Sequence, residues 1–295
     1  MKLHVINTGN FKLDGGAMFG VVPKSLWSKT NPADESNMCN WGLRCLLIED
    51  GNRLTLIDNG IGNKQDAKFY SHYFLNGNDT LENSMKIAGF SADDVTDMFL
   101  THLHFDHCGG SIKYNESRTS LETVYKNAVY WSNAEHWEWA VKPNAREKPS
   151  FLKENILPIK ESGQLQLIDT NNKNIIGTNE YAAGKDLGEN ISIMLTRGHT
   201  DAMMIPHIQY RGKTVVYMAD LLPSTGHIPL PYIMGYDTRP LLSLSEKESF
   251  MKRATDEEFI LFFEHDAVNE CCTVQHTEKG VRLKETFTLK EYFGE

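Results

Sequence analysis

Cysteine is scarce in this chain and shows none of the spacings that mark a structural role. There are five cysteines in 295 residues, an odd number, and no Cys-x-x-Cys pair is among them. Small secreted domains that depend on disulfides carry paired, closely spaced cysteines, so we expect reduced thiols instead. The opening segment, MKLHVINTGN, holds one lysine and lacks the apolar stretch of a secretory signal. We therefore expect a cytoplasmic protein.

Clusters of basic residues are also absent. Thirty lysine and arginine side chains face 39 acidic ones, which gives a formal net charge of −9. Affinity for nucleic acid or for an anionic membrane comes mainly from clustered positive charge, so neither is an expected partner. No apolar run approaches the roughly 18 residues of a membrane-spanning helix. The charge balance favours a small, neutral or weakly polar molecule as substrate.

Internal repeats and linkers rich in proline, serine or glycine are missing, so we expect one domain over residues 1–295. Apolar runs predict strands at residues 3–7, 97–101, 128–131, 191–196, 203–210, 214–218 and 259–263, and hairpins of 44–49 with 54–58 and of 273–275 with 281–288. Helices are predicted at 80–88 and 243–254, and Gly15-Gly16 predicts a turn back into a strand. Each half places strands before a helix. Two such halves facing each other would form a sandwich of sheets with helices outside.

The segment THLHFDHCGG, residues 101–110, carries the strongest chemical signal. It places three histidines and an aspartate within six positions, directly after a predicted strand. Side chains two apart in an extended segment point the same way, so His102 and His104 can bind one ion. Asp106 and His107 follow where the chain turns away, and they can reach a second ion. Imidazole and carboxylate together suit zinc, iron, manganese or cobalt, unlike the all-oxygen sites of calcium.

Three further candidate ligands each follow a predicted strand. They are His199 in TRGHTD, Asp220 in YMADLLP and His265 in FFEHDA. Taken alone, such a residue is more often a polar group satisfied by its own surroundings than a metal ligand. Together with the histidine cluster, they predict a pair of transition-metal ions.

This ligand pattern resembles the metallo-β-lactamase superfamily, and the likeness in ligands and strand order covers essentially the whole chain. The resemblance implies an α+β fold, the four-layer αβ/βα sandwich. It also implies two Zn²⁺ ions, with iron, manganese or cobalt as alternatives. The first ion would be bound by His102, His104 and His199, the second by Asp106, His107 and His265, and Asp220 would bridge the two. Asp58, in LIDNG, resembles the aspartate that orients a metal-binding histidine, and its alternative role is to cap the turn at Gly60.

Residues 13–27 and 219–237 resemble the branch of N-acyl-homoserine lactonases, which are quorum-quenching enzymes. The resemblance implies a metal-dependent ester and lactone hydrolase, in which a metal-bridging hydroxide opens the ring and Asp106 passes a proton to the leaving oxygen. Loops around the site would set specificity, and we expect these loop residues to contact the substrate: Met18, Phe19, His227, Tyr232 and Tyr236. The alternative for Met18 and Phe19 is core packing, and the alternative for His227 is a solvated position in a loop.

One position departs from that branch. The lactonases have a tyrosine three positions after the bridging aspartate, and this chain has Pro223 there. Tyr232 or Tyr236 would have to take its place. Two other functions therefore stay open: a phosphotriesterase or general esterase on the same metals, and a non-hydrolytic metal-binding or redox protein, although the complete ligand set opposes the latter. A homodimer is the candidate assembly.

Overall fold

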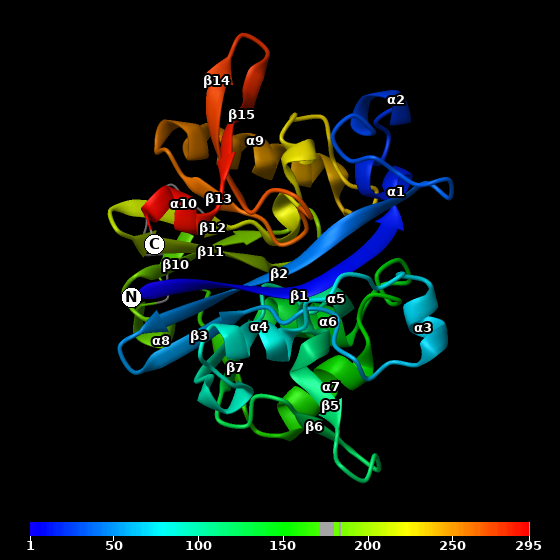
Figure 1. Cartoon of the computed structure of the whole chain (residues 1–295), viewed down its shortest axis with the longest axis vertical. Coiled ribbons are helices and arrows are strands. Elements are labelled where there is room, and N and C mark those ends of the chain that lie inside the picture. The colour runs from blue at the N-terminus through cyan, green and yellow to red at the C-terminus, as the bar shows by residue number, and fades with distance from the viewer. Residues whose placement is uncertain (171–179, 183, 295) are drawn as a thin grey trace. The chain divides into compact units, whose positions relative to one another are not determined.

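Strands and helices alternate along most of the chain. The computed structural model describes residues 1–170, 180–182 and 184–294 (Figure 1). The strands are β1 (Lys2–Asp14), β2 (Met38–Asp50), β3 (Arg53–Ile57), β4 (Asp97–Phe99), β5 (Ile112–Tyr114), β6 (Leu121–Thr123), β7 (Val129–Asn133), β8 (Leu165–Ile168), β9 (Glu180–Ala182), β10 (Ile191–Thr196), β11 (Met203–Tyr210), β12 (Lys213–Tyr217), β13 (Ile260–Phe262), β14 (Cys271–Thr277) and β15 (Gly280–Phe287). The helices are α1 (Gly15–Phe19), α2 (Lys24–Trp27), α3 (Ala67–Ser71), α4 (Leu81–Ile87), α5 (Phe105–Cys108), α6 (Ala134–Val141), α7 (Lys153–Glu161), α8 (Gly184–Leu187), α9 (Pro240–Asp256) and α10 (Leu289–Phe293). Short 3-10 turns are η1 (Ala92–Asp94), η2 (Gly109–Ser111), η3 (Ala219–Leu221) and η4 (Thr225–His227).

The chain divides into two compact units, and each is described by itself. The first comprises Met1–Gly9 and Leu43–Glu189, and the second comprises Asn10–Gly42 and Asn190–Glu295. The strands β1 and β2 each belong partly to one unit and partly to the other. The expectation of one domain over the whole chain stays a prediction.

The sheet of the first unit has the strand order β1-β2-β3-β4-β7-β8. The predicted hairpin at its centre is confirmed, because β2 pairs antiparallel with β3 and Asp50 lies opposite Arg53. Strands β3, β4, β7 and β8 run parallel, with Ile57 beside Phe99 at the ends of β3 and β4. The carboxyl ends of parallel strands meet at one edge of a sheet. The segments that follow β3 and β4 carry Asp58 and the histidine motif, so the topology brings them together.

Helices pack on this sheet through a single cluster of apolar side chains. Met85 of α4, Trp137 of α6 and Ile156 of α7 lie in it with Leu56 and Met98 of the sheet. Burying a side chain of this size stabilises the fold by about 1.5–3 kcal/mol. The predicted helix at 80–88 is confirmed as α4, whose first turn is capped by Thr80. Helices α6 and α7 are not among the predicted elements, and α7 contains Pro158, a residue that usually ends a helix.

The sheet of the second unit has the strand order β15-β14-β13-β12-β11-β10. The predicted strands at 191–196 and 203–210 are confirmed at those bounds. Strand β11 is antiparallel to β10 and to β12, and β12 is parallel to β13. Strands β10, β12 and β13 therefore point the same way and end at one edge. The segments that follow them carry His199, Asp220 and His265.

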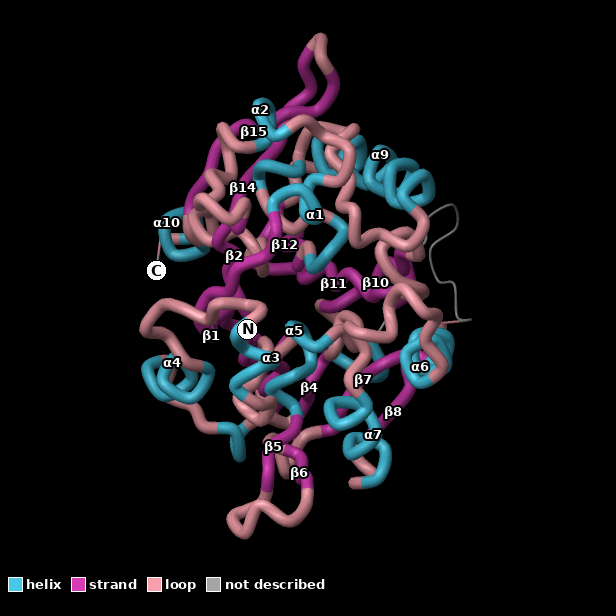
Figure 2. The backbone as a smooth tube through the Cα atoms, turned by 90° about the vertical axis from the view of Figure 1, so that its right-hand side faces the viewer, coloured by secondary structure: helices cyan, strands magenta, loops and turns pink. Residues whose placement is uncertain are grey.

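The C-terminal part of this unit combines a helix with a long hairpin. Helix α9 begins with a proline in its first turn and packs on β14 and β15. The predicted hairpin is confirmed, since Thr277 pairs with Gly280 across a two-residue turn. Its tip projects away from the sheet (Figures 1 and 2). In the part of the chain that the structure describes, no helix has the length and apolar character needed to cross a membrane.

The predicted turn at Gly15-Gly16 is wrong, because this segment forms the short helix α1. Asp14 caps the helix, and its carboxylate accepts a hydrogen bond of 2.8 Å from the amide of Ala17. A Cβ on Gly15 would lie 2.4 Å from the ring of Trp27. The glycine is needed for this close approach, whereas the sequence pattern suggests a chain reversal.

Gly109 makes a second close approach, directly after the histidine motif. A Cβ at this position would lie 2.2 Å from the carbonyl oxygen of Ile61, while φ at Gly109 is an ordinary −62°. The loop at Ile61 is also tied to the motif by a hydrogen bond of 2.9 Å from the amide of Asn59 to the carbonyl of His107. The missing side chain at Gly109 thus lets this loop support the motif.

Gly109→Ala is expected to lower the free energy of unfolding by about 2–3 kcal/mol, because the methyl group must displace backbone atoms. Urea unfolding of the metal-free protein, followed by tryptophan fluorescence, measures the loss. Gly163→Ala is the matched control: its φ is +80°, but a Cβ there meets nothing within 4 Å. In Gly163→Ala the free energy of unfolding should fall by only about 1 kcal/mol, because the alanine must adopt a left-handed backbone conformation. Equal losses in the two variants would contradict the packing argument.

Candidate metal centre

His102 and His104 face each other on the extended segment that follows β4. Nε2 of His102 lies 3.1 Å from Nδ1 of His104, and the ring centroids are 4.6 Å apart. Both side chains are buried. The structure thus places the two imidazoles as their spacing in an extended segment predicts.

The chain turns away at His104, which is the N-cap of the short helix α5. This helix carries Asp106 and His107, with Oδ2 of Asp106 lying 3.9 Å from Nε2 of His107. Both residues are buried, His107 completely. The four predicted ligands of the motif therefore occupy two adjacent pieces of backbone, one extended and one helical.

The carboxylate of Asp58 contacts two residues of this motif, Thr101 and His107. It accepts hydrogen bonds from the amide of Thr101 at 2.8 Å and from the hydroxyl of Thr101 at 2.7 Å. The amide donates to Oδ1 and the hydroxyl to Oδ2, and Oδ2 also lies 3.1 Å from Nδ1 of His107. Asp58 is fully buried and has φ of +55°, a strained value for a residue with a side chain. Its carboxylate bonds the motif, whereas a cap of the turn at Gly60 was the alternative.

The second unit brings its three predicted ligands together around one carboxylate. Oδ2 of Asp220 lies 3.0 Å from Nε2 of His199, and Oδ1 lies 3.1 Å from Nε2 of His265. Asp220 sits on η3, directly after Ala219, whose φ is +41°. Each oxygen of the carboxylate thus faces a different imidazole.

The remaining ring nitrogens of these histidines face partners that the sequence does not signal. Nδ1 of His199 lies 3.0 Å from Asp237, and Nδ1 of His265 lies 2.9 Å from the carbonyl oxygen of Gly42. Burial disfavours a charged His199, but the carboxylates of Asp220 and Asp237 outweigh it and raise its pKa to about 10. The environment of His199 is therefore one that favours positive charge.

One buried histidine outside the predicted set has a structural role. Nε2 of His136 accepts a hydrogen bond of 2.9 Å from the amide of Leu103, between the two histidines of the motif. The amide of His136 is itself bonded to Asn133 at 2.9 Å. His136 thus fixes the extended backbone that orients His102 and His104.

The spacing of these donor atoms fits a transition-metal ion. Zinc binds nitrogen and oxygen at about 2.0–2.1 Å, which places tetrahedral ligands roughly 3.3 Å apart. Within the first unit, the pair of His102 and His104 is spaced at 3.1 Å. Within the second unit, the two pairs made by Asp220 are spaced at 3.0 and 3.1 Å. Imidazole and carboxylate are also the ligand types that zinc prefers.

Three residues predicted to contact substrate lie buried in the second unit: Met18, Phe19 and His227. The ring of Phe19 stacks on His227 at 4.2 Å between centroids. Nε2 of His227 lies 3.0 Å from the carbonyl of Met18, and Nδ1 lies 2.8 Å from the hydroxyl of Ser224. Burial lowers the pKa of His227 to about 3, which keeps the ring neutral. The alternative of a solvated loop position for His227 is therefore wrong.

The two candidate tyrosines differ in exposure. Tyr232 is half-buried, with its ring edge-on to Phe19 at 6.2 Å. Tyr236 is 40% exposed, so its ring is open to solvent. Tyr236 is thus the more accessible of the two.

A buried lysine holds the loop that carries these side chains. Lys247 of α9 is 1% exposed, and its ammonium group donates to the carbonyls of His227, Pro229 at 3.0 Å, Leu230 at 3.4 Å and Tyr232 at 2.9 Å. Burial lowers its pKa to about 7 from the ordinary 10.5. One side chain therefore satisfies several carbonyl groups along residues 227–232, and the carbonyl of Pro229 also accepts from the amide of Tyr232 at 2.9 Å.

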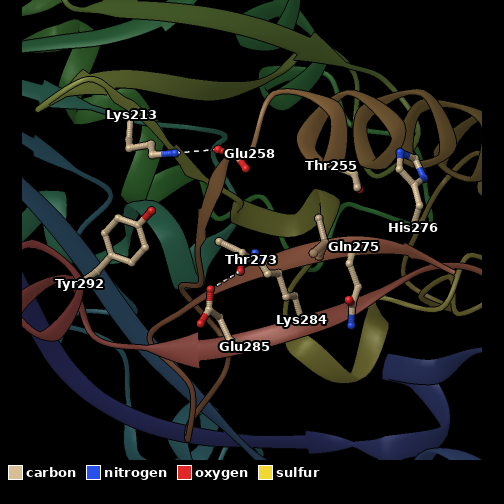
Figure 3. Close-up of a pocket in the computed structure, with 10 residues that line it drawn as sticks. Lys213, Thr255, Glu258, Thr273, Gln275, His276, Lys284, Glu285 and Tyr292 are labelled. Atoms are coloured by element: carbon tan, nitrogen blue, oxygen red, sulfur yellow. Dashed lines mark hydrogen bonds and ion pairs between the residues drawn. The ribbon is translucent and has the colours of Figure 1, made fainter.

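The second unit also has a surface pocket that is separate from its predicted metal ligands. Charged and polar side chains line it, and several are paired with each other (Figure 3). Lys213 bonds Glu258 at 2.8 Å, and Thr273 bonds Glu285 at 3.1 Å. The predicted ligands of this unit do not line it.

Residues 44–265 match the family described as the Metallo-beta-lactamase superfamily. This span is most of the 295-residue chain, and the chain belongs to that superfamily. Its fold is the metallo-β-lactamase fold, and it is a hydrolase of this superfamily. The predictions of fold family and enzyme class are confirmed.

Its relatives include lactonases. The N-acyl homoserine lactonase of Bacillus thuringiensis is 24% identical over 282 residues, which cover 91% of this chain and 94% of the relative. A probable metal-dependent hydrolase from Staphylococcus aureus superposes with a TM-score of 0.83 at 27% identity, over 97% of this chain and 96% of that one. AidC, a dizinc quorum-quenching lactonase in complex with a product, superposes with a TM-score of 0.74 at 20% identity, over 98% and 97% of the two chains. The chain is thus similar to lactonases along nearly its full length.

The buried Lys247 makes stability depend on pH. Between about pH 7 and 10.5 the unfolded chain holds the lysine proton and the folded chain does not, so raising the pH favours folding. The free energy of unfolding of the wild type, relative to Lys247→Met, is expected to rise across this range by at most about 1.4 kcal/mol per pH unit. Urea unfolding at several pH values measures it.

Lys252→Met is the matched control, because Lys252 lies on the same helix, is exposed, and bonds Asp256 through its ammonium group. The difference in free energy of unfolding between Lys252→Met and the wild type should not change between pH 7 and 9. A flat difference for Lys247→Met as well would show that its ammonium group titrates normally.

Proposed function

We propose that this hydrolase binds two zinc ions and opens lactones, with N-acyl-homoserine lactones as the first substrates to consider. One observation carries the proposal: the carboxylate of Asp220 presents each of its oxygens to a different buried histidine, at 3.0 and 3.1 Å. A carboxylate so placed is suited to bridge two ions. The curated lactonase relatives, which match 91% of this chain, support the choice of substrate.

The proposed ligands are those that the sequence predicts. His102, His104 and His199 would hold the first ion, Asp106, His107 and His265 the second, and Asp220 would bridge them. When bound, such a pair of ions lowers the pKa of a shared water toward neutrality and polarises the carbonyl of the substrate. Zinc is the first ion to test because the similar lactonase AidC is a dizinc enzyme, while iron, manganese and cobalt accept the same donors.

Asp106 is the proposed proton carrier. Its side chain is 12% exposed and sits in the first turn of α5, next to the completely buried His107. Ring opening adds water across the bond between the carbonyl carbon and the ring oxygen. Asp106 would hold the proton of that water at a carboxylate oxygen and deliver it to the leaving ring oxygen, which gives the open hydroxy acid.

Recognition of the substrate falls to the loop held by Lys247. Tyr236 is the better candidate to contact the substrate carbonyl in place of the tyrosine that Pro223 replaces, because 40% of it is exposed. Met18 and Phe19 are buried. The ring of Phe19 stacks on His227 and the carbonyl of Met18 lies 3.0 Å from Nε2 of His227, so we assign both residues the role of supporting the loop.

A small-molecule substrate, no nucleic acid, no membrane and a homodimer remain the predicted partners. The cytoplasm remains the proposed compartment. All five cysteines are buried and carry free thiols, as expected in a reducing environment.

The test of this proposal is a substrate panel on zinc-loaded protein. N-acyl-homoserine lactones of several chain lengths are compared with simple aryl esters and with a phosphotriester of the paraoxon type. Turnover of the lactones should exceed the others by at least tenfold in kcat/KM. Preferential turnover of the phosphotriester would select the phosphotriesterase alternative. If no substrate is hydrolysed and the iron-loaded protein consumes oxygen, the redox function is selected.

Asp106→Asn should lower kcat by a factor of at least 100, because an amide neither binds the second ion as well nor carries the proton. The fold should persist, which circular dichroism and urea unfolding check. Asp93→Asn is the control, since Asp93 is exposed on η1. Near-normal turnover by Asp106→Asn would remove Asp106 from the mechanism.

His265→Ala should lower the metal content from about two ions to about one per chain, because it removes one ligand of a single ion. Elemental analysis after dialysis measures the ratio. His276→Ala serves as control, because His276 is an exposed histidine of the same unit that bonds Asp256 at 2.7 Å. An unchanged ratio in His265→Ala would contradict its assignment as a ligand.

A further inference from the structure

A buried glutamate lies beside the histidine motif and has no part in the mechanism above. Glu147 is 4% exposed and belongs to the loop between α6 and α7. Its oxygen Oε2 accepts hydrogen bonds from the indole of Trp139 at 2.8 Å and from the side-chain amide of Asn144 at 2.5 Å. Both of these donors approach the same oxygen. The other oxygen, Oε1, faces the ring of His104, at 3.6 Å from Nε2.

The loop fixes the direction of this carboxylate. The side-chain oxygen of Asn144 accepts from the amides of Arg146 at 2.9 Å and Glu147 at 3.0 Å, which leaves its NH₂ group to donate to Glu147. The carbonyl of Glu147 accepts from the amide of Ser150 at 2.8 Å. Glu147 is therefore bonded through its backbone on both sides and through Oε2, and these contacts direct Oε1.

His104 is also held between two groups. Nδ1 points to Nε2 of His102 at 3.1 Å, and Nε2 points to Glu147. The ring of Phe151 packs against the imidazole at 4.6 Å between centroids. The distance of 3.6 Å from Nε2 to Oε1 lies within the range of an ion pair and just beyond that of a hydrogen bond. The two nitrogens of His104 thus have distinct surroundings, one beside a proposed ligand and one beside a carboxylate.

We propose that Glu147 is a positioning residue for His104: it binds the hydrogen on Nε2 and so presents the bare Nδ1 to the metal ion. This inference rests on the metal binding of the proposed function and not on the substrate. A neutral imidazole has a hydrogen on only one nitrogen, and an acceptor at Nε2 selects the tautomer with Nδ1 free. Outer acceptors of this kind also keep the ring in place and raise its basicity toward the ion.

The arrangement predicts that glutamine is a poor replacement in spite of its equal size. If the glutamine oxygen faces Trp139 and Asn144, its NH₂ group must face Nε2 of His104. That nitrogen then becomes an acceptor, and the hydrogen moves to Nδ1, where it blocks the metal. If the amide is turned around, the NH₂ group instead meets the two donors. Glu147→Gln therefore either inverts the tautomer of His104 or loses the bonds that hold residue 147.

The first experiment reads the tautomer in metal-free protein by long-range ¹H–¹⁵N NMR of the histidine rings, with His104→Asn used to assign the signals. In the wild type, His104 should carry its hydrogen on Nε2. In Glu147→Gln it should carry it on Nδ1, and in Glu147→Asp a part of the wild-type signal should return. Glu138→Gln makes the same substitution on α6 at an exposed residue that bonds Lys142, and it should leave the tautomer unchanged. The same tautomer in Glu147→Gln as in the wild type would overturn the proposal.

The second experiment measures zinc affinity by competition with a chromophoric chelator. Loss of an outer partner usually weakens metal binding about 10- to 100-fold, and that loss is expected for Glu147→Gln and Glu147→Ala but not for Glu138→Gln. Urea unfolding of each metal-free variant shows which are folded, and the aspartate variant serves if alanine does not fold. Unchanged affinity in a folded glutamine variant overturns the inference. A wild type that binds zinc but leaves lactones intact would refute the proposed substrate and leave Glu147 in its role.

Discussion

A buried imidazole has two nitrogens, and each needs a partner because an unsatisfied buried polar atom costs about 1–3 kcal/mol. The five predicted histidine ligands share one arrangement of their two nitrogens, although the 3.6 Å from His104 to Glu147 and the 3.9 Å from His107 to Asp106 lie beyond hydrogen-bonding range. One nitrogen faces another predicted ligand, and the other faces an outer group of the same unit. The outer groups are the hydroxyl of Thr101 for His102, Glu147 for His104, Asp58 for His107, Asp237 for His199 and the carbonyl of Gly42 for His265. The outer groups thereby decide which nitrogen is available to a metal, so the chemistry of the site depends on them as much as on the ligands.

Within each unit, several strands of the sheet end at the same edge, and this brings the ligands and their outer partners together. In the first unit β3 and β4 are parallel neighbours, so Asp58 and Thr101 meet at one edge. In the second unit β10, β12 and β13 point the same way, so Asp220 meets both of its histidines at one edge. The polar groups follow the buried strands, where the chain is free to turn. A rigid sheet thus fixes the starting point of each segment, and short strained turns such as Ala219, with φ of +41°, set its direction.

The strands and the ligand types could be predicted from the sequence because both are local signals. Apolar runs predict β10 and β11 at their observed bounds, and the spacing of His102 and His104 predicts their common direction. The outer partners could not be predicted in this way. Asp237 lies 38 residues from His199, and Gly42 lies 223 residues from His265, so only the tertiary fold pairs them. The helix α1 was missed for a similar reason: Gly15 is there because of the distant ring of Trp27, and a glycine pair alone looks like a turn.

The substrate is a different matter from the metal centre, because lactones, esters and phosphotriesters all present an electrophilic centre with an oxygen to polarise. In the proposed function, selection among them falls to the loop after Asp220, where Pro223 departs from the lactonase pattern. In this chain Lys247 holds part of that loop through its carbonyl groups, and Phe19 stacks on His227, a side chain of the loop itself. Polar side chains hold other parts of the loop, since Thr225 bonds Asp266 and Asp237 lies 3.0 Å from His199. These contacts leave the exposed side chains of the loop free to vary while the loop keeps its shape. In the proposed function, exposed positions of this loop such as Tyr236 are therefore the ones at which a substitution would change the substrate while the buried supports stay intact.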